Sequence, residues 1–274
     1  MRGPALLLAG VVTALVFGPL AVPFHYAAQD RDQIAAPPSA QHPLGTDSLG
    51  RDNLARFLIG GRLSLALAGA AALAACSIAA AVGTAAALGG RAAHVAGALW
   101  FDTMLSTPWY LLVFCLRAAL PLDASPAMTA ALTFALLGTA GWAQGARAIR
   151  DEVKQSAQSA WMLQSRSLGF GGATLLWGHI TPFVQPLLWA QFLMLLPKLL
   201  LAESTLGMLG LGVPEPLPSW GGCLADLLQP GATERPWLFI PAIALGLIVI
   251  SFRALAANGK QNTIPPGTED ITVR

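Results

Sequence analysis

Ionisable residues are scarce in this chain, so those inside apolar stretches are the first candidates for chemistry. Of the 274 residues, 55% are hydrophobic and 11% are charged. Asp102, Lys198 and Glu203 lie within or at the end of long apolar blocks. An ionisable group in lipid is costly and normally faces a cavity or another polar group. These three side chains are therefore expected to face a cavity, a partner or the interface.

The spacing of these residues leaves their roles open. Lys198 and Glu203 are five residues apart, whereas facing residues on a helix are three or four apart. For Lys198 the simpler expectation is an ammonium that extends along the helix to the lipid–water interface. Asp102 precedes Pro108, whose missing N–H would bend the helix. A structural role for Asp102 is therefore as well supported as a functional one.

Other signatures of catalysis or cofactor binding are absent from the sequence. The three cysteines and four histidines stand apart, with no CxxC pair, so we expect no metal site. There is no GxxxxGK[ST] phosphate loop and no LSGGQ-type signature, so the chain is not expected to hydrolyse ATP itself. Without a GxSxG or HExxH motif, a membrane-embedded enzyme is not favoured. A net charge of +2 is too small to indicate a nucleic-acid partner.

The apolar residues gather in six blocks that predict transmembrane helices. A block of about 20 residues spans the hydrocarbon layer as a helix, and lipid leaves the backbone no other partners. The blocks lack the alternation of barrel strands. The first is long and lacks a cleavage site, which favours a retained helix over a signal peptide. The chain is therefore predicted to be an all-α membrane protein with blocks at 5–24, 63–88, 93–120, 127–143, 183–202 and 236–256.

This pattern divides the chain into four parts. We expect an N-terminal transmembrane helix at 1–24, an external segment at 25–62, a transmembrane core at 63–257 and a disordered tail at 258–274. Six crossings place both termini and the loop 144–182 on one side. Arginine and lysine favour the cytoplasm. Nine of these residues fall on the side of the termini and seven on the opposite side, which weakly favours a cytoplasmic location for the termini and the loop.

The loop 144–182 has the most informative polar pattern. It predicts an amphipathic helix through about Ser167, a turn at Leu168-Gly169 and a second short helix that ends before Ile180-Thr181-Pro182. Glycine after a helix provides a left-handed cap that lets the chain turn sharply. Two interpretations remain: a rigid lever docked in a soluble partner, or an amphipathic helix that rests on lipid headgroups.

Three motifs in order resemble the C-type permease subunit of ABC importers for dipeptides, oligopeptides and nickel. Residues 42–52 read HPLGTDSLGRD and resemble that subfamily's HPLGTDxxGRD signature. Residues 165–169 read SRSLG and, with Ile180-Thr181-Pro182, resemble the cytoplasmic EAA loop of these permeases. Residues 209–221 resemble the LGLG…PxPSWG segment, and Glu203 precedes them where the family commonly has a glutamate. The resemblance covers roughly residues 5–260.

The chain also departs from the family pattern. It has Leu163-Gln164-Ser165 where the loop usually reads Glu-Ala-Ala, and Leu99 where an arginine often precedes Asp102. Lys198 is not expected in the fifth block either. These departures bear on the coupling contacts and the substrate.

The resemblance implies a type I ABC importer permease fold that forms half of a translocation pathway in a bacterial cytoplasmic (inner) membrane. It implies a second homologous permease subunit, two cytoplasmic ATPase subunits that bind ATP and Mg²⁺, and an external substrate-binding protein. The chain itself would be no enzyme and would hold no cofactor. The expected substrates are di- or oligopeptides, with nickel or a nickel chelate as the alternative.

The resemblance also implies roles for particular residues. Asp47, Arg51 and Asp52 belong either to a structural loop, in which Arg51 pairs with one of the aspartates, or to the face that receives the binding protein. Glu203 would lie at the outer mouth of the translocation path, with Asp102 as the other candidate. The residues expected to couple to the ATPase are Arg166, Ser167, Leu168, Gly169, Ile180 and Pro182.

The rival function is an autonomous secondary transporter or channel. Such a protein, purified alone, would move solute down an ion gradient without ATP. A permease subunit would transport nothing until its ATPase partners are added.

Overall fold

The computed structural model describes residues 2–20, 25–108, 111–113, 115, 125–159, 164–165, 167–168, 178 and 180–261. Within these ranges the chain is helical apart from its loops, and the β-type pairing is a single isolated bridge between Thr46 and Asp52. The prediction of an all-α protein is therefore confirmed.

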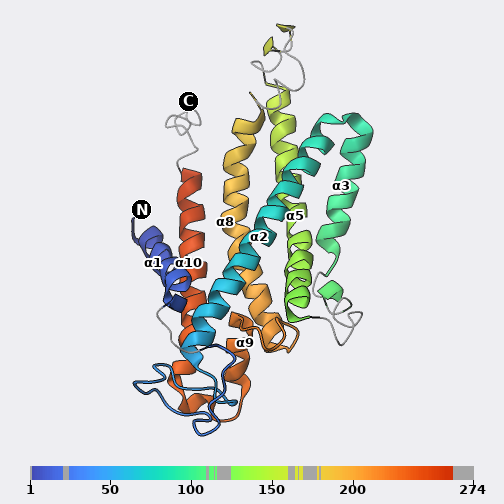
Figure 1. Ribbon diagram of the computed structural model, residues 1–274. Helices are drawn as coiled ribbons and strands as arrows, with labels where there is room; N and C mark the ends of the chain where they lie inside the picture. Colours follow the sequence, from blue (N-terminus) through green and yellow to red (C-terminus); the bar gives the residue numbers. More distant parts are fainter. Residues whose placement is uncertain are drawn as a thin grey trace.

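Six long helices in the described ranges lie side by side as an elongated bundle (Figure 1). Apolar stretches long enough to cross a membrane lie at Gly3–Leu20, Asn53–Leu88, Val184–Met208 and Pro236–Ala257. Two further long helices pack alongside them, which confirms the expectation of about six transmembrane helices. The six are α1 (Arg2–Phe17), α2 (Asn53–Leu88), α3 (Gly90–Ser106), α5 (Pro126–Ala157), α8 (Thr181–Met208) and α10 (Ile240–Gln261).

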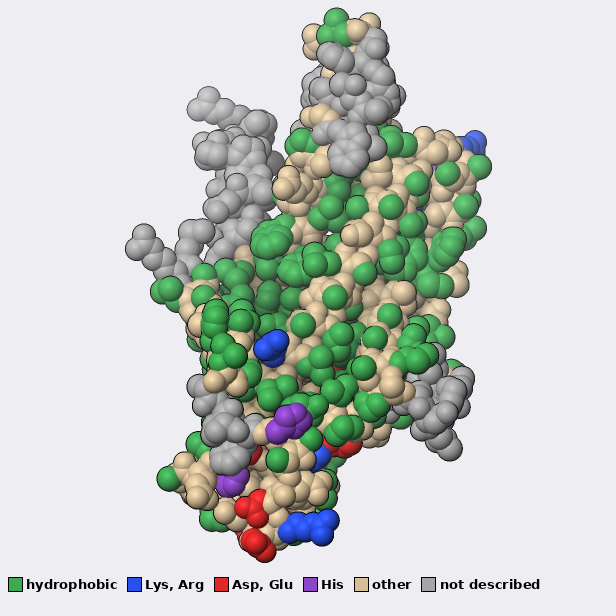
Figure 2. All heavy atoms as spheres, in the orientation of Figure 1, with side chains coloured by type: hydrophobic (Ala, Val, Ile, Leu, Met, Phe, Trp, Pro, Cys, Tyr) green, Lys and Arg blue, Asp and Glu red, His purple; other side chains and the backbone are tan. Residues whose placement is uncertain are grey.

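The two ends of the bundle differ. At the lower end of Figure 1, the loop 25–52 lies beside the short helix α9 (Trp220–Ala225) and the turns that follow it. Those turns are η3 (Asp226–Leu228), η4 (Ala232–Glu234) and η5 (Pro236–Phe239), and η1 (Gly18–Leu20) ends α1. We call this the loop end. Acidic and basic side chains gather there, whereas apolar side chains cover most of the helices above it (Figure 2).

Helix α2 begins ten residues before the expected apolar block. Asp52 caps it, because its Oδ1 accepts a hydrogen bond from the backbone N–H of Ala55 at 2.6 Å. A side-chain cap satisfies a backbone donor that the first turn leaves free, so the helix can start in polar sequence. Residues 53–62, which the sequence placed in the external segment, therefore belong to α2. With 36 residues, α2 is ~54 Å long at 1.5 Å per residue.

Helix α5 is also longer than its apolar block. Ser125 caps it by accepting from the N–H of Met128 at 3.2 Å, and Pro126 stands in its first turn, where proline fits because no N–H is needed. The helix continues without a break from the apolar block through residue 157. The first part of the predicted loop 144–182 is thus the end of α5.

Pro108 ends α3 and does not bend it. The helix stops at Ser106, and Thr107 has extended backbone angles of −76° and 123°. Proline disfavours the α conformation in the residue before it, which explains the stop. The bend expected at Pro108 inside a longer third helix was therefore wrong for this stretch.

Small residues bring α2 and α5 close together, and this pair has the most extensive contact among the described elements. A Cβ added at Gly83 would lie 2.6 Å from the carbonyl oxygen of Ala146, and one at Gly138 would lie 2.9 Å from that of Ala71. Such close backbone approach is what small residues permit in membrane bundles.

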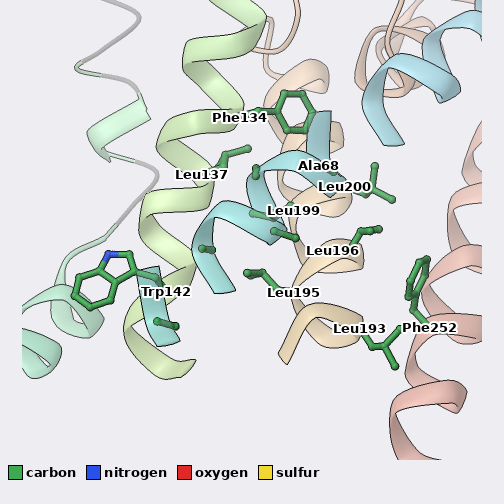
Figure 3. Packing of buried hydrophobic residues seen from close by; sticks show 14 of the residues in the cluster. Ala68, Phe134, Leu137, Trp142, Leu193, Leu195, Leu196, Leu199, Leu200 and Phe252 are labelled. Carbon is green, nitrogen blue, oxygen red and sulfur yellow. The ribbon is translucent and has the colours of Figure 1, made fainter. Parts of the chain in front are cut away.

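Leucines of α8 fill the space beside this pair. Leu195 points toward α5, whereas Leu193 points toward Phe252 of α10 (Figure 3). Both leucines are buried in one apolar cluster that also includes Phe134 and Leu137 of α5. The core of the chain therefore sits between α2, α5, α8 and α10.

Candidate functional site

Five charged side chains meet at the loop end and form what we call the charged cluster. They come from the loop 25–52, the first turn of α2, the segment after α8 and the end of α9. Pairs within the cluster are as far apart in sequence as Arg51 and Glu215. The members of the charged cluster are Asp47, Arg51, Arg56, Glu215 and Asp226.

Asp47 is the buried centre of the charged cluster and is only 3% exposed. Its carboxylate accepts hydrogen bonds from Arg51 Nε at 2.7 Å and from Arg56 Nη1. It also accepts from the backbone N–H groups of Leu49 at 2.8 Å and Arg51 at 2.9 Å. A buried charge is tolerated when it is paired and hydrogen-bonded in this way. The expected pairing of Arg51 with Asp47 is therefore observed.

Glu215 joins the two arginines from the other side. Its Oε1 accepts from Arg51 Nη2 at 3.2 Å and from Arg56 Nη2 at 3.1 Å. Its side chain is 54% exposed, in contrast to the arginines, which are buried. Glu215 therefore ties the loop 25–52 to the segment after α8 and is the most solvent-exposed member of the cluster.

Asp52 takes a different partner. Its Oδ2 lies 2.8 Å from Nδ1 of His42, while its Oδ1 caps α2. Gly45 and Gly50 have positive φ angles of 64° and 76°, and a Cβ on either would collide with the backbone of residues 30–37. Only glycine adopts such angles freely. The HPLGTDSLGRD motif thus folds the loop onto itself and starts α2.

The pKa values of Asp47 and Asp226, the two aspartates of the charged cluster, are shifted in opposite directions. Burial alone would raise the pKa of Asp47, but the N–H of Arg51 and the charge of Arg56 outweigh burial, so the pKa of Asp47 is lowered. Burial raises the pKa of Asp226 to about 6, although Arg56 acts against the rise. Asp226 lies 4.0 Å from Arg56. The arginines therefore neutralise Asp47 better than Asp226.

Glu203 lies inside the chain between α2, α8 and α9. It is 0% exposed, and its Oε2 accepts hydrogen bonds from Ser64 Oγ and from the N–H of Gly221, each at 3.3 Å. Ser64 Oγ also accepts from the N–H of Trp220 at 3.2 Å. A Cβ on Gly221 would lie 2.6 Å from Glu203 Oε1. This carboxylate therefore holds α9 against the bundle, and its place in a translocation path stays a prediction.

Asp102 lies apart from Glu203 and has a partner of its own. It pairs with Arg147 of α5, and its side chain is 59% exposed. One turn further along α5, the guanidinium of Arg150 lies 5.5 Å from the centre of the Phe101 ring. Asp102 thus joins α3 to α5, and its role in a path also stays a prediction.

Comparison with known proteins decides the family. Residues 77–259, two thirds of the chain, match the family model described as "binding-protein-dependent transport system inner membrane component". The chain belongs to this permease family. It is therefore a multi-pass membrane protein of an importer system.

Individual relatives match the permease over nearly its whole length. It is 29% identical to the oligopeptide transport system permease protein of Bacillus subtilis (strain 168), over 93% of this chain and 82% of the relative. It is 31% identical to the dipeptide transport system permease protein of the same organism, over 97% and 81%. The oligopeptide transport system permease protein of Escherichia coli (strain K12) is 33% identical over 92% and 82%.

The predicted coupling residues of the permease are only partly described. Ser167 and Leu168 follow Gln164, whose carbonyl accepts from Ser167 Oγ at 2.7 Å and from the N–H of Leu168 at 3.1 Å. The Leu168 side chain is 70% exposed. Arg166 and Gly169 lie outside the described residues.

The other two coupling residues stand at the start of α8. Ile180 is buried, whereas Pro182 is exposed in the first turn. The coupling role of this whole set stays a prediction.

Sequence reasoning missed three members of the charged cluster in the permease: Arg56, Glu215 and Asp226. Arg56 was assigned to a loop, and its place in the first turn of α2 depends on the Asp52 cap. Glu215 sits in a Pro-rich stretch, 164 residues from Arg51 in the chain. A local signal existed, because both Glu215 and Arg51 lie in motifs that the sequence had already singled out.

Proposed function

We propose that this chain is the permease subunit of an ATP-driven peptide importer and forms half of its transmembrane pathway. The observation that carries the proposal is the match, over more than nine-tenths of the chain, to permeases named for oligopeptides and dipeptides. These names favour peptides over nickel as cargo. The chain would work with a second homologous permease subunit, two cytoplasmic ATPase subunits that hold ATP and Mg²⁺, and an external binding protein.

The arrangement of the helices supports a division of labour between the two ends. The loop end would face outward, where Asp47, Arg51 and Asp52 shape a rigid platform and the half-exposed Glu215 is available to the binding protein. The opposite end would face the cytoplasm. There α5 ends and α8 begins (Figure 1), on either side of the segment that resembles the coupling loop.

Transport would follow from movement at the cytoplasmic end. ATP binding draws the ATPase subunits together, and the coupling segment passes this movement to α5 and α8. Because α5 is one unbroken helix and α8 packs against it, a shift at this end reaches the bundle core. Access would then alternate between the two membrane faces, with no covalent bond made or broken in this chain.

Reconstitution tests the proposal. The purified chain alone, and the complete set of two permeases, two ATPase subunits and binding protein, are placed in liposomes and given radiolabelled tri-alanine. We expect uptake only from the complete set, and only with ATP. Uptake by the chain alone down an ion gradient would instead establish a secondary transporter.

A point substitution tests the coupling end. Leu168→Asp places a charge on a side chain that is 70% exposed and should cost the chain little stability. We expect it to reduce co-purification of the ATPase subunits at least ~10-fold, as loss of an apolar interface hot spot does. Leu228→Asp, at a leucine that is 63% exposed at the loop end, is the matched control. Equal ATPase binding by both variants would contradict the assigned coupling role.

A further inference from the structure

One face of α8 is left uncovered by the residues that the structure describes. Met194, Lys198, Leu201 and Thr205 are exposed, at spacings of four, three and four residues. That spacing defines a single face of a helix. Residues on the opposite side of the helix, including Leu195, Leu199 and Glu203, are buried. The stripe is therefore a face that α8 offers to something outside this chain.

Lys198 lies on this stripe near the middle of the span. It is ten residues from Met208, where α8 ends, a distance of ~15 Å at 1.5 Å per residue. That is more than the length of a lysine side chain, so the ammonium cannot reach the loop-end interface by extending along the helix. The other end of α8 is further away still. The expectation of a lysine at the interface is therefore not supported by its position.

No ion pair joins Lys198 to any residue in the part of the chain that the structure describes. Exposing such a cation to lipid costs ~2.5–3.5 kcal/mol at the centre of a helix. Charged residues at this depth usually face water or an opposite charge. Lys198 therefore requires water or an anion on the uncovered face of α8.

Two hollows flank Lys198, one on each side of α8. The first, of about 250 Å³, lies between α3, α5 and α8 and includes the amides of Gln144 and Gln191. The second, of about 350 Å³, lies between α8 and α10 and includes Arg253. Arg253 is exposed and, like Lys198, has no ion-pair partner among the described residues. Neither hollow is lined by a carboxylate.

We propose that Lys198, with Arg253 beside it, forms a cationic site in the translocation path that binds the carboxylate of the transported peptide. The inference rests on the proposed function, which makes the uncovered face of α8 a wall of the path. An ammonium binds a carboxylate through charge-assisted hydrogen bonds, and every unmodified linear peptide carries a terminal carboxylate. A lysine and an arginine without a fixed counter-ion attract such a group, yet the site stays open enough to release it.

Uptake of paired probes tests the site. The complete transporter in liposomes receives tri-alanine or tri-alanine amide, each with the wild-type chain, Lys198→Met or Lys198→Arg. We expect Lys198→Met to lower tri-alanine uptake at least ~10-fold and amide uptake less than ~2-fold, while Lys198→Arg retains most of both. The same binding protein serves all variants. Its own preference between the two probes therefore cancels when the uptake by each variant is divided by the uptake of the same probe by wild type.

Two results would overturn the proposal. In one, Lys198→Met leaves tri-alanine uptake unchanged. In the other, it lowers uptake of both probes equally and the second permease subunit dissociates, which would assign Lys198 to an ion pair between the two permeases. A wild-type complex that moves neither probe would contradict the proposed function instead, and a labelling experiment then decides on the lysine alone.

Labelling measures whether water reaches position 198. In a chain with Cys76, Cys115 and Cys223 replaced by alanine, Lys198→Cys is treated with a negatively charged, water-soluble methanethiosulfonate. We expect it to react, because an aqueous site lets the reagent reach position 198. The control is Ile250→Cys, which is exposed ten residues into α10 and lines neither hollow. No reaction at position 198, or equal reaction at both positions, would refute an aqueous cationic site.

Discussion

The charged cluster and the uncovered face of α8 both hold basic side chains, but only those of the charged cluster are paired with carboxylates of the described chain. At the loop end Arg51 and Arg56 are buried, and each meets at least two carboxylates of the same chain. On α8, Lys198 is exposed in a deep apolar setting with no carboxylate around its hollows. A cation paired within the chain stabilises the fold. One left without a partner at membrane depth indicates a missing molecule.

The largest effect should come from breaking the cluster. Arg56→Ala removes one of the two arginines that neutralise Asp47 and Glu215. Arg51 remains on both carboxylates, so we expect a loss of ~3 kcal/mol in the free energy of unfolding, the lower end of the range for broken buried ion pairs. Thermal melting in detergent measures it. Arg62→Ala, at an exposed arginine on the same helix, is the control and should change stability little. Similar losses of stability in the two variants would contradict a special contribution of the paired arginine.

A smaller effect is expected at the contact between α2 and α5. Gly83→Ala places a methyl group 2.6 Å from the carbonyl oxygen of Ala146, and such overpacking typically costs ~1–3 kcal/mol. Gly69→Ala on the same helix meets no atom within 4 Å. Because alanine favours helix over glycine, Gly69→Ala should be neutral or slightly stabilising. Thermal melting of the two variants in parallel measures the difference. An unchanged melting temperature of Gly83→Ala would argue against close packing of α2 and α5 at this position.

The pH dependence of stability separates the aspartates within the cluster. The folded-state pKa of Asp226 is raised to about 6, so its contribution is full below the unfolded value near 3.8 and is lost as pH rises through 6. Asp47 behaves oppositely, because its pKa is lowered: its contribution is present above 3.8 and is lost as pH falls below that value.

Replacing Asp226 isolates the first contribution. Between pH 5 and pH 7, wild type should lose ~1 kcal/mol in the free energy of unfolding relative to Asp226→Asn, because a folded pKa of about 6 places most of the ionisation in this range. Melting at several pH values in one detergent measures the difference. If stability depends on pH in the same way in the two proteins, the pKa of Asp226 is not raised in the folded state.

The smallest effect belongs to the exposed pair between α3 and α5. Asp102→Asn removes the partner of Arg147, but both side chains are well exposed, and exposed pairs contribute ~0.2–1 kcal/mol. We expect a small change in melting and uptake within twofold of wild type. A large loss of uptake with normal melting would place Asp102 in the path after all.

The apolar blocks located the long helices, because lipid imposes a length and a composition that are visible in sequence. Their ends were less visible. The start of α2 depends on the Asp52 carboxylate and the end of α3 on Pro108, and local polarity suggested neither boundary. The pairing of Arg51 with Glu215 connects residues 164 positions apart, which a single sequence cannot reveal. Lys198 stood out by its charge, but only the packed helices show which face of α8 it occupies.

The close approach of α2 and α5 has a mechanical consequence. Gly83 meets Ala146 and Gly138 meets Ala71, so the two helices touch backbone to backbone at two separated levels. Two such contacts prevent one helix from sliding or pivoting on the other. A displacement applied where α5 ends should therefore move both helices as one rigid body. The relative motion that opens a passage must then occur at contacts between other helices.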